Sequence, residues 1–177
     1  WPRDSCRIVC PRSGKSQPAM LSVAIFAIGD NGPGDGWVFY DKGYYSDSWR
    51  YLEAAPDSTE WEDKMWGEFD SEIGTTETGI GTGLENTLQI ASYYDADSYA
   101  ADLCHNLEVN DKDDWFLPSL DELELMNENL NLAEPPIGGF EEYSVYWSSS
   151  EYQNNPLNVW SQCFDPFDNQ QYSSKIT

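Results

Sequence analysis

The sequence predicts a single domain of the α+β class. A chain of 177 residues suits one domain, and its eight Trp, eleven Tyr and seven Phe supply bulk for a sizeable core. Apolar residues recur at helical spacing in two stretches, 84–107 and 119–130. Short apolar runs bounded by Gly, Pro and acidic residues elsewhere indicate strands. Helices and strands therefore occupy separate parts of the chain, as in α+β domains.

The segment 113–123 is predicted to join an extended run to a helix. Trp115, Phe116 and Leu117 form a bulky apolar run that Pro118 ends, because the residue before a proline disfavours helix. Ser119 with Glu122 three residues later makes a capping box, so a helix is expected from Ser119 to Leu130. The residues expected to be buried are Trp115, Leu117, Tyr146 and Trp147.

The remaining elements follow from periodicity and turn signals. Leu84, Leu88 and Ala91 share a face of a helix over 84–94, which is interrupted at 95–98 and resumes over 99–107. The predicted strands are 21–28, 37–40, 49–55 and 146–149. The first two are expected to pair as a hairpin through the Gly-rich turn 30–36.

The charge of the chain is asymmetric. The formal net charge is −23, yet four of the nine basic residues stand in the first twenty, namely Arg3, Arg7, Arg12 and Lys15. We therefore predict a basic N-terminal arm over residues 1–20 and an acidic domain over residues 21–177. An acidic surface repels phosphate backbones, so nucleic acid is not an expected partner. No run reaches the roughly eighteen apolar residues of a transmembrane segment.

The sequence gives little evidence for a catalytic site or for a cofactor site. His105 is the single histidine and stands in a predicted helix, which favours a structural role. No Ser-His-Asp set can be assembled, and Ser148–Ser150 lack the glycines of a nucleophile elbow. Oxygen ligands in the turn 30–36 suit calcium, but other positions of a calcium loop are missing. We predict no enzyme activity and no cofactor, with calcium as the alternative.

Four cysteines are an even number without the spacing of a zinc site. The sequence leaves their connectivity open. The expected pairs are Cys104 with Cys163 over a long range and Cys6 with Cys10 locally. Disulfides would place the protein in an oxidising setting, outside the cell or at its surface.

Several ordered motifs carry a resemblance to a known family. They are Asp114-Trp115-Phe116-Leu117-Pro118-Ser119, Tyr146-Trp147-Ser148-Ser149-Ser150-Glu151, Gly36–Gly43, Trp49–Pro56 and Ile80-Gly81-Thr82-Gly83. Together they resemble the DUF1566 family, the Legionella collagen-like protein C-terminal domain, from about Ile28 to Lys175. The resemblance implies a C-type-lectin-like fold, with two helices around a small, mainly antiparallel sheet. It also implies a binding scaffold, which is shared with formylglycine-generating enzymes.

The C-terminal stretch combines aromatic residues with polar residues that donate and accept hydrogen bonds, as antibody paratopes do. In related domains it can be a hypervariable region. Two interpretations stay open, a hypervariable ligand-binding surface and an ordinary polar hairpin. The candidate binding residues are Tyr152, Gln153, Asn154, Asn155, Asn158, Trp160, Asp168, Asn169, Gln171 and Tyr172.

These features predict an extracellular or cell-surface module that binds a protein or glycan. The triplet Asn154-Asn155-Pro156 makes calcium-dependent sugar binding a weaker variant. The alternative function is a structural subunit of a fibre or appendage. In that case the basic arm of one copy would lie on the acidic body of the next. The family's closing strand is not matched at Ile176-Thr177, which would leave a sheet edge open to a neighbour.

Overall fold

The computed structural model describes residues 6–14, 25–68, 71–74, 76–94, 98–155 and 158–165, together with the backbone of 171–173. Within these residues the chain forms seven strands, three α-helices and two short helical turns. The strands are β1 (Cys6–Arg7), β2 (Pro11–Ser13), β3 (Trp37–Ser46), β4 (Trp49–Ala54), β5 (Val145–Glu151), β6 (Val159–Cys163) and β7 (Gln171–Ser173). The helices are α1 (Gly83–Tyr94), α2 (Ala100–His105) and α3 (Leu120–Met126), with a 3-10 turn at Asp57–Thr59 and a π-helical turn at Asn127–Asn131.

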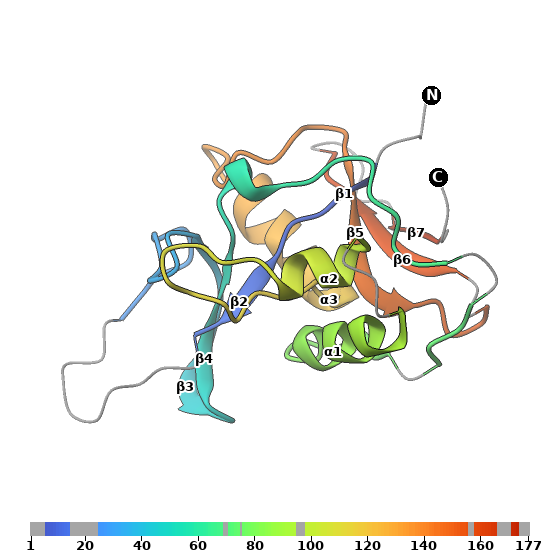
Figure 1. Ribbon diagram of the computed structural model, residues 1–177. Helices are drawn as coiled ribbons and strands as arrows, with labels where there is room; N and C mark the ends of the chain where they lie inside the picture. Colours follow the sequence, from blue (N-terminus) through green and yellow to red (C-terminus); the bar gives the residue numbers. More distant parts are fainter. Residues whose placement is uncertain are drawn as a thin grey trace.

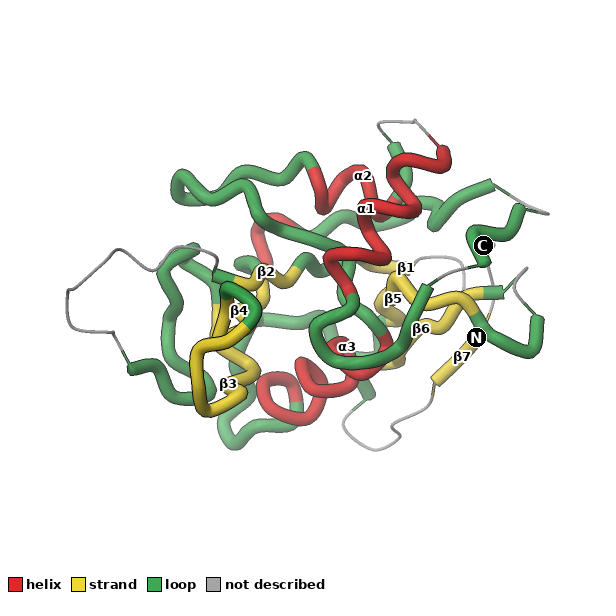
Figure 2. Tube along the Cα trace, turned by 90° about the horizontal axis from the view of Figure 1, so that it is seen from below, coloured by secondary structure: helices red, strands yellow, loops and turns green. Residues whose placement is uncertain are grey.

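The strands form two sheets, whereas the family resemblance implied one. The first sheet has the order β1-β5-β6-β7, with β1 parallel to β5 and the other pairs antiparallel. The second is antiparallel, with the order β2-β4-β3. Figures 1 and 2 show the two sheets on either side of the helices. Helix α3 contacts β5 and β6 of one sheet and β3 of the other. The α+β class is confirmed, and the arrangement of its elements differs from the single small sheet expected.

The apolar core is divided into two clusters by extended segments that are buried on both sides. Successive side chains of an extended chain point in opposite directions. Trp115 and Leu117 therefore enter one cluster and Phe116 enters the other. In β5, Trp147 likewise enters the first cluster and Tyr146 enters the second. Trp115, Leu117, Tyr146 and Trp147 are all buried, as the sequence predicted.

The capping box predicted at Ser119 is present. The Ser119 side chain accepts a hydrogen bond from the backbone N–H of Glu122, and the Glu122 carboxylate accepts one from the backbone N–H of Ser119. Helix α3 begins at Leu120 and passes into the π-helical turn that contains Leu130. The predicted helices over 84–94 and 99–107 correspond to α1 and α2.

The predicted hairpin between 21–28 and 37–40 is reduced, in its described part, to a turn closed by an antiparallel bridge between Asn31 and Trp37. Residues 25–28 form no strand, and residues 21–24 lie outside the described residues. Strand β3 instead pairs with β4. Asp47 and Ser48 connect the two strands, and both have positive φ, 52° and 70°. Such a two-residue turn matches the twist of adjacent strands. The predicted strands 37–40, 49–55 and 146–149 correspond to β3, β4 and β5.

Residues 6–14 lie inside the fold, whereas the sequence placed them in an arm outside the domain. β1 pairs with β5 of the first sheet, and β2 pairs with β4 of the second. Ile8 and Cys10 belong to one core cluster, and Val9 belongs to the other. The buried Arg12 guanidinium forms ion pairs with Glu53 and with Asp114, the latter at 2.6 Å. This segment therefore joins the two sheets, because its backbone pairs with each in turn.

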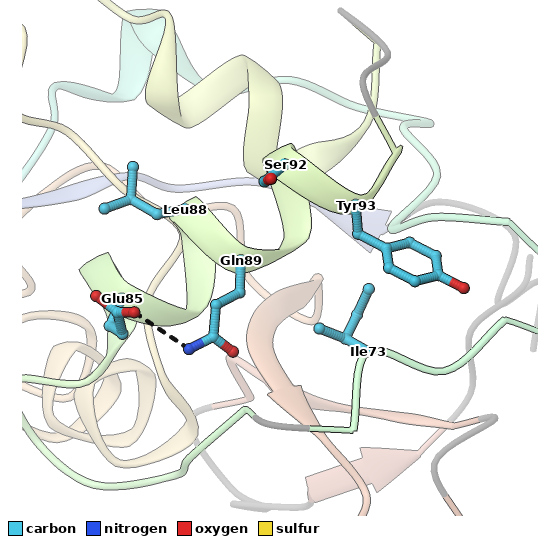
Figure 3. Close-up of a pocket in the computed structure, with 6 residues that line it drawn as sticks. All are labelled: Ile73, Glu85, Leu88, Gln89, Ser92 and Tyr93. Carbon is cyan, nitrogen blue, oxygen red and sulfur yellow. Dashed lines mark hydrogen bonds between the residues drawn. The ribbon is translucent and has the colours of Figure 1, made fainter.

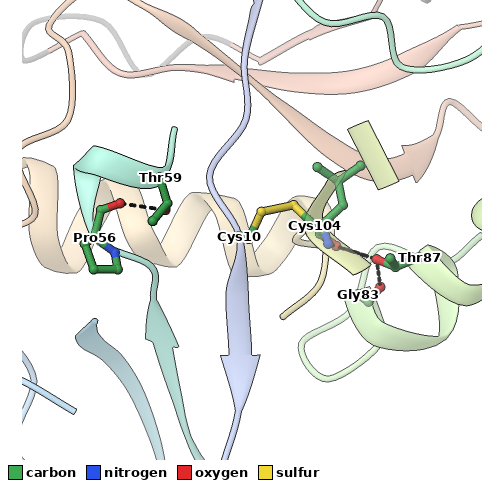
Figure 4. The surroundings of a disulfide bond; sticks show 7 residues. Cys10, Pro56, Thr59, Gly83, Thr87 and Cys104 are labelled. Carbon is green, nitrogen blue, oxygen red and sulfur yellow. Dashed lines mark hydrogen bonds between the residues drawn. A yellow bond between two sulfur atoms is a disulfide. The ribbon is translucent and has the colours of Figure 1, made fainter. Parts of the chain in front are cut away.

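The disulfide joins Cys10 to Cys104, across 94 residues of sequence (Figure 4). Both expected pairs are therefore wrong. Cys6 and Cys10 lie four residues apart on an extended segment, which places their Cα atoms roughly 13 Å apart. A disulfide requires Cα atoms within about 7 Å. Cys104, the expected partner of Cys163, faces Cys10 from α2 in the same core cluster.

Candidate functional site

The predicted binding residues that precede β6 lie in the connection between β5 and β6. Three backbone hydrogen bonds fold this connection into a compact corner. The N–H of Tyr152 donates to the carbonyl of Asn158 at 2.8 Å, and the N–H of Asn155 donates to that of Tyr152 at 2.9 Å. The N–H of Asn158 donates to the carbonyl of Asn155, also at 2.8 Å. The corner is therefore held by its own backbone.

Two aromatic rings meet at this corner. Tyr152 and Trp160 pack edge to face, with their ring centroids 4.8 Å apart and their planes at 87°. The side-chain amide of Asn154 donates to the Tyr152 hydroxyl at 3.2 Å. Gln153, Asn154 and Asn155 are exposed, whereas Tyr152, Asn158 and Trp160 are half-buried. We call the six residues Tyr152, Gln153, Asn154, Asn155, Asn158 and Trp160 the aromatic-amide corner.

Of the four other predicted binding residues, two lie in the described part of the chain. Gln171 and Tyr172 lie in β7, opposite Gln162 and Ser161 of β6. Strand β7 thus runs beside the strand that carries Trp160. Asp168 and Asn169 lie outside the described residues.

The serines after Trp147 serve the fold through hydrogen bonds. The Ser148 hydroxyl donates to the carbonyl of Trp160 at 2.8 Å, and the Ser150 hydroxyl donates to that of Glu77 at 2.8 Å. Ser149 accepts from the side-chain amide of Asn86 at 3.0 Å. All three serines are buried. Their hydrogen bonds connect β5 to β6, to the segment 76–82 and to α1.

Buried carboxylates also bind structural partners. Burial raises the pKa of Glu122 to about 7, although backbone N–H groups of Ser119, Gly81 and Gly83 oppose this shift. Burial likewise raises the pKa of Glu60 to about 7, against the opposing effect of the Tyr146 hydroxyl and the Arg7 guanidinium. Such pKa values occur at catalytic sites and in structural clusters alike. Here both carboxylates are enclosed by groups that connect segments of the fold.

The turn 30–36 binds the carboxylate of Glu53, a residue of β4, and Arg12 neutralises this carboxylate. Glu53 accepts hydrogen bonds from the backbone N–H of Gly34 at 3.0 and 3.1 Å and forms its ion pair with Arg12. The Arg12–Glu53 ion pair therefore lies beside Gly34 of this turn. Among the described residues no group of three or more His, Cys, Asp or Glu side chains is placed to hold a metal ion. His105 is exposed at the end of α2.

A second surface feature, which the sequence did not predict, lies along α1. It is an open hollow of about 540 Å³ (Figure 3). Its lining residues are Ile73, Glu85, Leu88, Gln89, Ser92 and Tyr93. The exposure of Leu88 and Tyr93, which are 40% and 55% accessible, is the unusual feature of this helix face. Helical spacing placed Leu88 on one face with Leu84 and Ala91, and no sequence signal showed that the loop 71–74 would lie beside it.

Comparison with protein-family models gave no match for this chain. Searches of curated proteins and of solved structures also gave none. No helix among the described residues is long and apolar enough to cross a membrane.

Proposed function

We propose that this chain is a ligand-binding module without enzyme activity, located outside the cell or at its surface. The ligand is a protein or a glycan, and it binds the aromatic-amide corner. The observation that carries this proposal is the Tyr152–Trp160 pair, surrounded by exposed amides on a turn held by backbone hydrogen bonds. Rigid aromatic rings supply contact area at low entropic cost, and amides adapt their hydrogen bonds to the partner.

The proposed location is supported by the Cys10–Cys104 disulfide, because such bonds persist in oxidising compartments. A C-type-lectin-like fold is the finer form of the proposal. It is supported by the sequence motifs quoted above, by the α+β class and by the burial of Trp115, Leu117 and Trp147 within those motifs. In this fold the connection after β5 would belong to the ligand-binding face.

The experiment replaces the exposed amides Gln153, Asn154 and Asn155 together by alanine. Binding is measured by surface plasmon resonance against a glycan panel and a panel of purified extracellular domains. The variant should lose binding to any ligand of the wild type while its melting temperature stays within about 2 °C, since surface substitutions cost little stability. The matched control replaces Ser58, Ser98 and Asn106, which are exposed elsewhere. Equal binding by the variant and the wild type would contradict the proposal.

The same assay, repeated with a chelator, tests whether sugar binding depends on calcium. If calcium bridges the ligand to Asn154 and Asn155, a chelator abolishes binding. If binding survives the chelator, the corner acts through hydrogen bonds and aromatic contacts alone.

We favour the binding module over the fibre subunit. The fibre hypothesis needs a basic arm that reaches a neighbouring copy. Arg7 and Arg12 of this arm instead form ion pairs within their own chain, with Glu60 and Glu62 and with Glu53 and Asp114. The particle mass by light scattering at micromolar concentration discriminates between the two. A monomer is expected, and assemblies that grow with concentration would favour the fibre.

A further inference from the structure

The hollow along α1 has the dimensions of a ligand site. Its volume of about 540 Å³ falls within the usual range of ligand pockets. Glu85, Gln89 and Tyr93 follow one another at intervals of four residues, so they form one line on the helix surface. Figure 3 shows Gln89 and Tyr93 with Ile73 facing them from the neighbouring loop. The hollow therefore combines an aromatic ring, an amide, a carboxylate and an apolar wall.

The loop wall of this hollow is fixed by a buried carboxylate. Glu151, at the end of β5, accepts hydrogen bonds from the backbone N–H of Ile73 at 2.9 Å and of Gly74 at 2.6 Å. Glu151 itself is 4% exposed. Two charge-assisted hydrogen bonds to consecutive N–H groups hold the position of Ile73.

The aromatic wall is also held in place. The Tyr93 ring packs edge to face on Tyr94, with centroids 5.1 Å apart. Tyr94 in turn packs against Tyr99 at 5.0 Å and against the buried Trp66 at 6.4 Å. A site whose walls are fixed before binding loses less conformational entropy when the ligand arrives.

No basic side chain in the described part of the chain neutralises the charge of the hollow. Among the described residues that line it, Glu85 is the charged one, and its carboxylate accepts a hydrogen bond from the Gln89 side chain at 3.3 Å. In the described part of the chain no basic side chain forms an ion pair with Glu85, whereas Arg7, Arg12, Lys42 and Arg50 pair with other acids. The net charge of −23 adds a long-range attraction for cations.

We propose that this hollow binds a basic side chain of a peptide segment. The ammonium or guanidinium group would pair with the Glu85 carboxylate, and a neighbouring side chain of the peptide would lie on the Tyr93 ring, because Glu85 and Tyr93 stand two helical turns, about 12 Å, apart on α1. The methylene stem of the basic side chain would contact Leu88, since long basic side chains bury their stems on apolar surface. The neighbouring side chain would contact Ile73, which lies beside Tyr93 (Figure 3). This site is separate from the aromatic-amide corner and does not depend on the function proposed there.

The test is a titration of the isotope-labelled protein followed by NMR. The probe is acetyl-Leu-Lys-Leu-Lys-amide, and its neutral counterpart is acetyl-Leu-Gln-Leu-Gln-amide. The lysine peptide should shift the backbone signals of Gln89, Ser92 and Tyr93 in a saturable manner. Glu85→Gln and Tyr93→Ala should each weaken binding by about fivefold, as expected for loss of one ion pair or one aromatic contact.

Two matched controls test the position of the site. Glu128→Gln removes an exposed acid, and Tyr143→Ala removes an exposed tyrosine, both outside the hollow. Both controls should bind the lysine peptide like the wild type. The proposal is overturned if the two peptides bind equally, if Glu85→Gln binds as tightly as the wild type, or if the shifted signals lie elsewhere. Binding of methyl glucoside at the hollow without binding of the lysine peptide would also overturn it.

Discussion

At the scale of single residues, this acidic protein uses buried carboxylates as connectors. Glu122 joins the start of α3 to the backbone of Gly81, and Glu151 joins the end of β5 to the loop at Ile73. Glu60 accepts from the Tyr146 hydroxyl at 3.1 Å and pairs with Arg7 at 3.1 Å. A carboxylate accepts several hydrogen bonds at once, which suits it to joining segments that form no regular ladder.

The raised pKa of Glu60 makes stability depend on pH. Its pKa in the folded protein is about 7, above the ordinary value of 4.5, so the folded state holds this proton more tightly than the unfolded state. The stabilisation from Glu60 is fully present below pH 4.5 and is lost as the pH rises through 7. Glu60→Gln removes this titration. Relative to the wild type, the variant should gain on the order of 2 kcal/mol of unfolding free energy between pH 5 and pH 8.

Urea denaturation of both proteins at pH 5, 6, 7 and 8 measures this difference. Comparing the two proteins at each pH cancels the repulsion among the remaining acids, which affects both. A difference in unfolding free energy that stays constant across the four pH values would show that Glu60 does not titrate in this range.

At the scale of elements, the segment 6–14 depends on its covalent link to α2. Strands β1 and β2 have two and three residues, so their ladders alone contribute little. The disulfide fixes Cys10 against Cys104 at the centre of one core cluster. Long-range cross-links stabilise mainly by restricting the unfolded chain.

Replacing both Cys10 and Cys104 by alanine should lower the free energy of unfolding by about 4 kcal/mol, as expected for a loop of this length. Thermal and urea denaturation measure the loss. The control is Cys6→Ala, which removes a buried thiol without removing a cross-link and should cost about 1 kcal/mol. If the double variant loses no more than Cys6→Ala, the disulfide does not stabilise the fold.

At the scale of the whole molecule, the two core clusters depend on the segments between them. Residues 8–10, 115–117 and 146–147 each contribute side chains to both clusters. Removing any of these segments exposes apolar surface on both sides. The two sheets are therefore expected to unfold together in one transition, as small domains usually do.

Deleting residues 1–14 tests this interdependence. The shortened chain lacks β1, β2, Cys10 and the buried Arg12, and leaves Glu53 without its cationic partner. We expect it to lose its cooperative thermal transition, as followed by near-ultraviolet circular dichroism. A chain that lacks residues 1–5 alone keeps both strands and should melt like the wild type. Cooperative melting of the chain without residues 1–14 would show that the arm predicted from the sequence is dispensable.

The sequence by itself determined the features that depend on neighbouring residues. The capping box at Ser119, the helices around Leu84–Tyr94 and Leu120–Met126, and the strands at Trp37, Trp49 and Tyr146 arise from side chains within a few positions of one another. Alternation and helical periodicity are properties of such short windows, so the chain alone reveals them. For the same reason the bulky run at Trp115 and Leu117 was predicted to be buried. For the candidate site, the polar and aromatic composition around Tyr152 was enough to nominate its residues from the sequence.

Only the tertiary structure decided which distant surfaces meet. The pairing of Cys10 with Cys104, the insertion of residues 6–14 between two sheets and the parallel contact of β1 with β5 join parts of the chain far apart in sequence. The hollow between α1 and Ile73 also arises in this way, whereas the contact of Tyr152 with Trp160 is made across the local turn between β5 and β6. Charge and composition suggested that Arg7 and Arg12 belong to a free arm. In the fold, each finds acidic partners at the edge of a sheet, because the burial of neighbouring Ile8, Val9 and Cys10 carries them there.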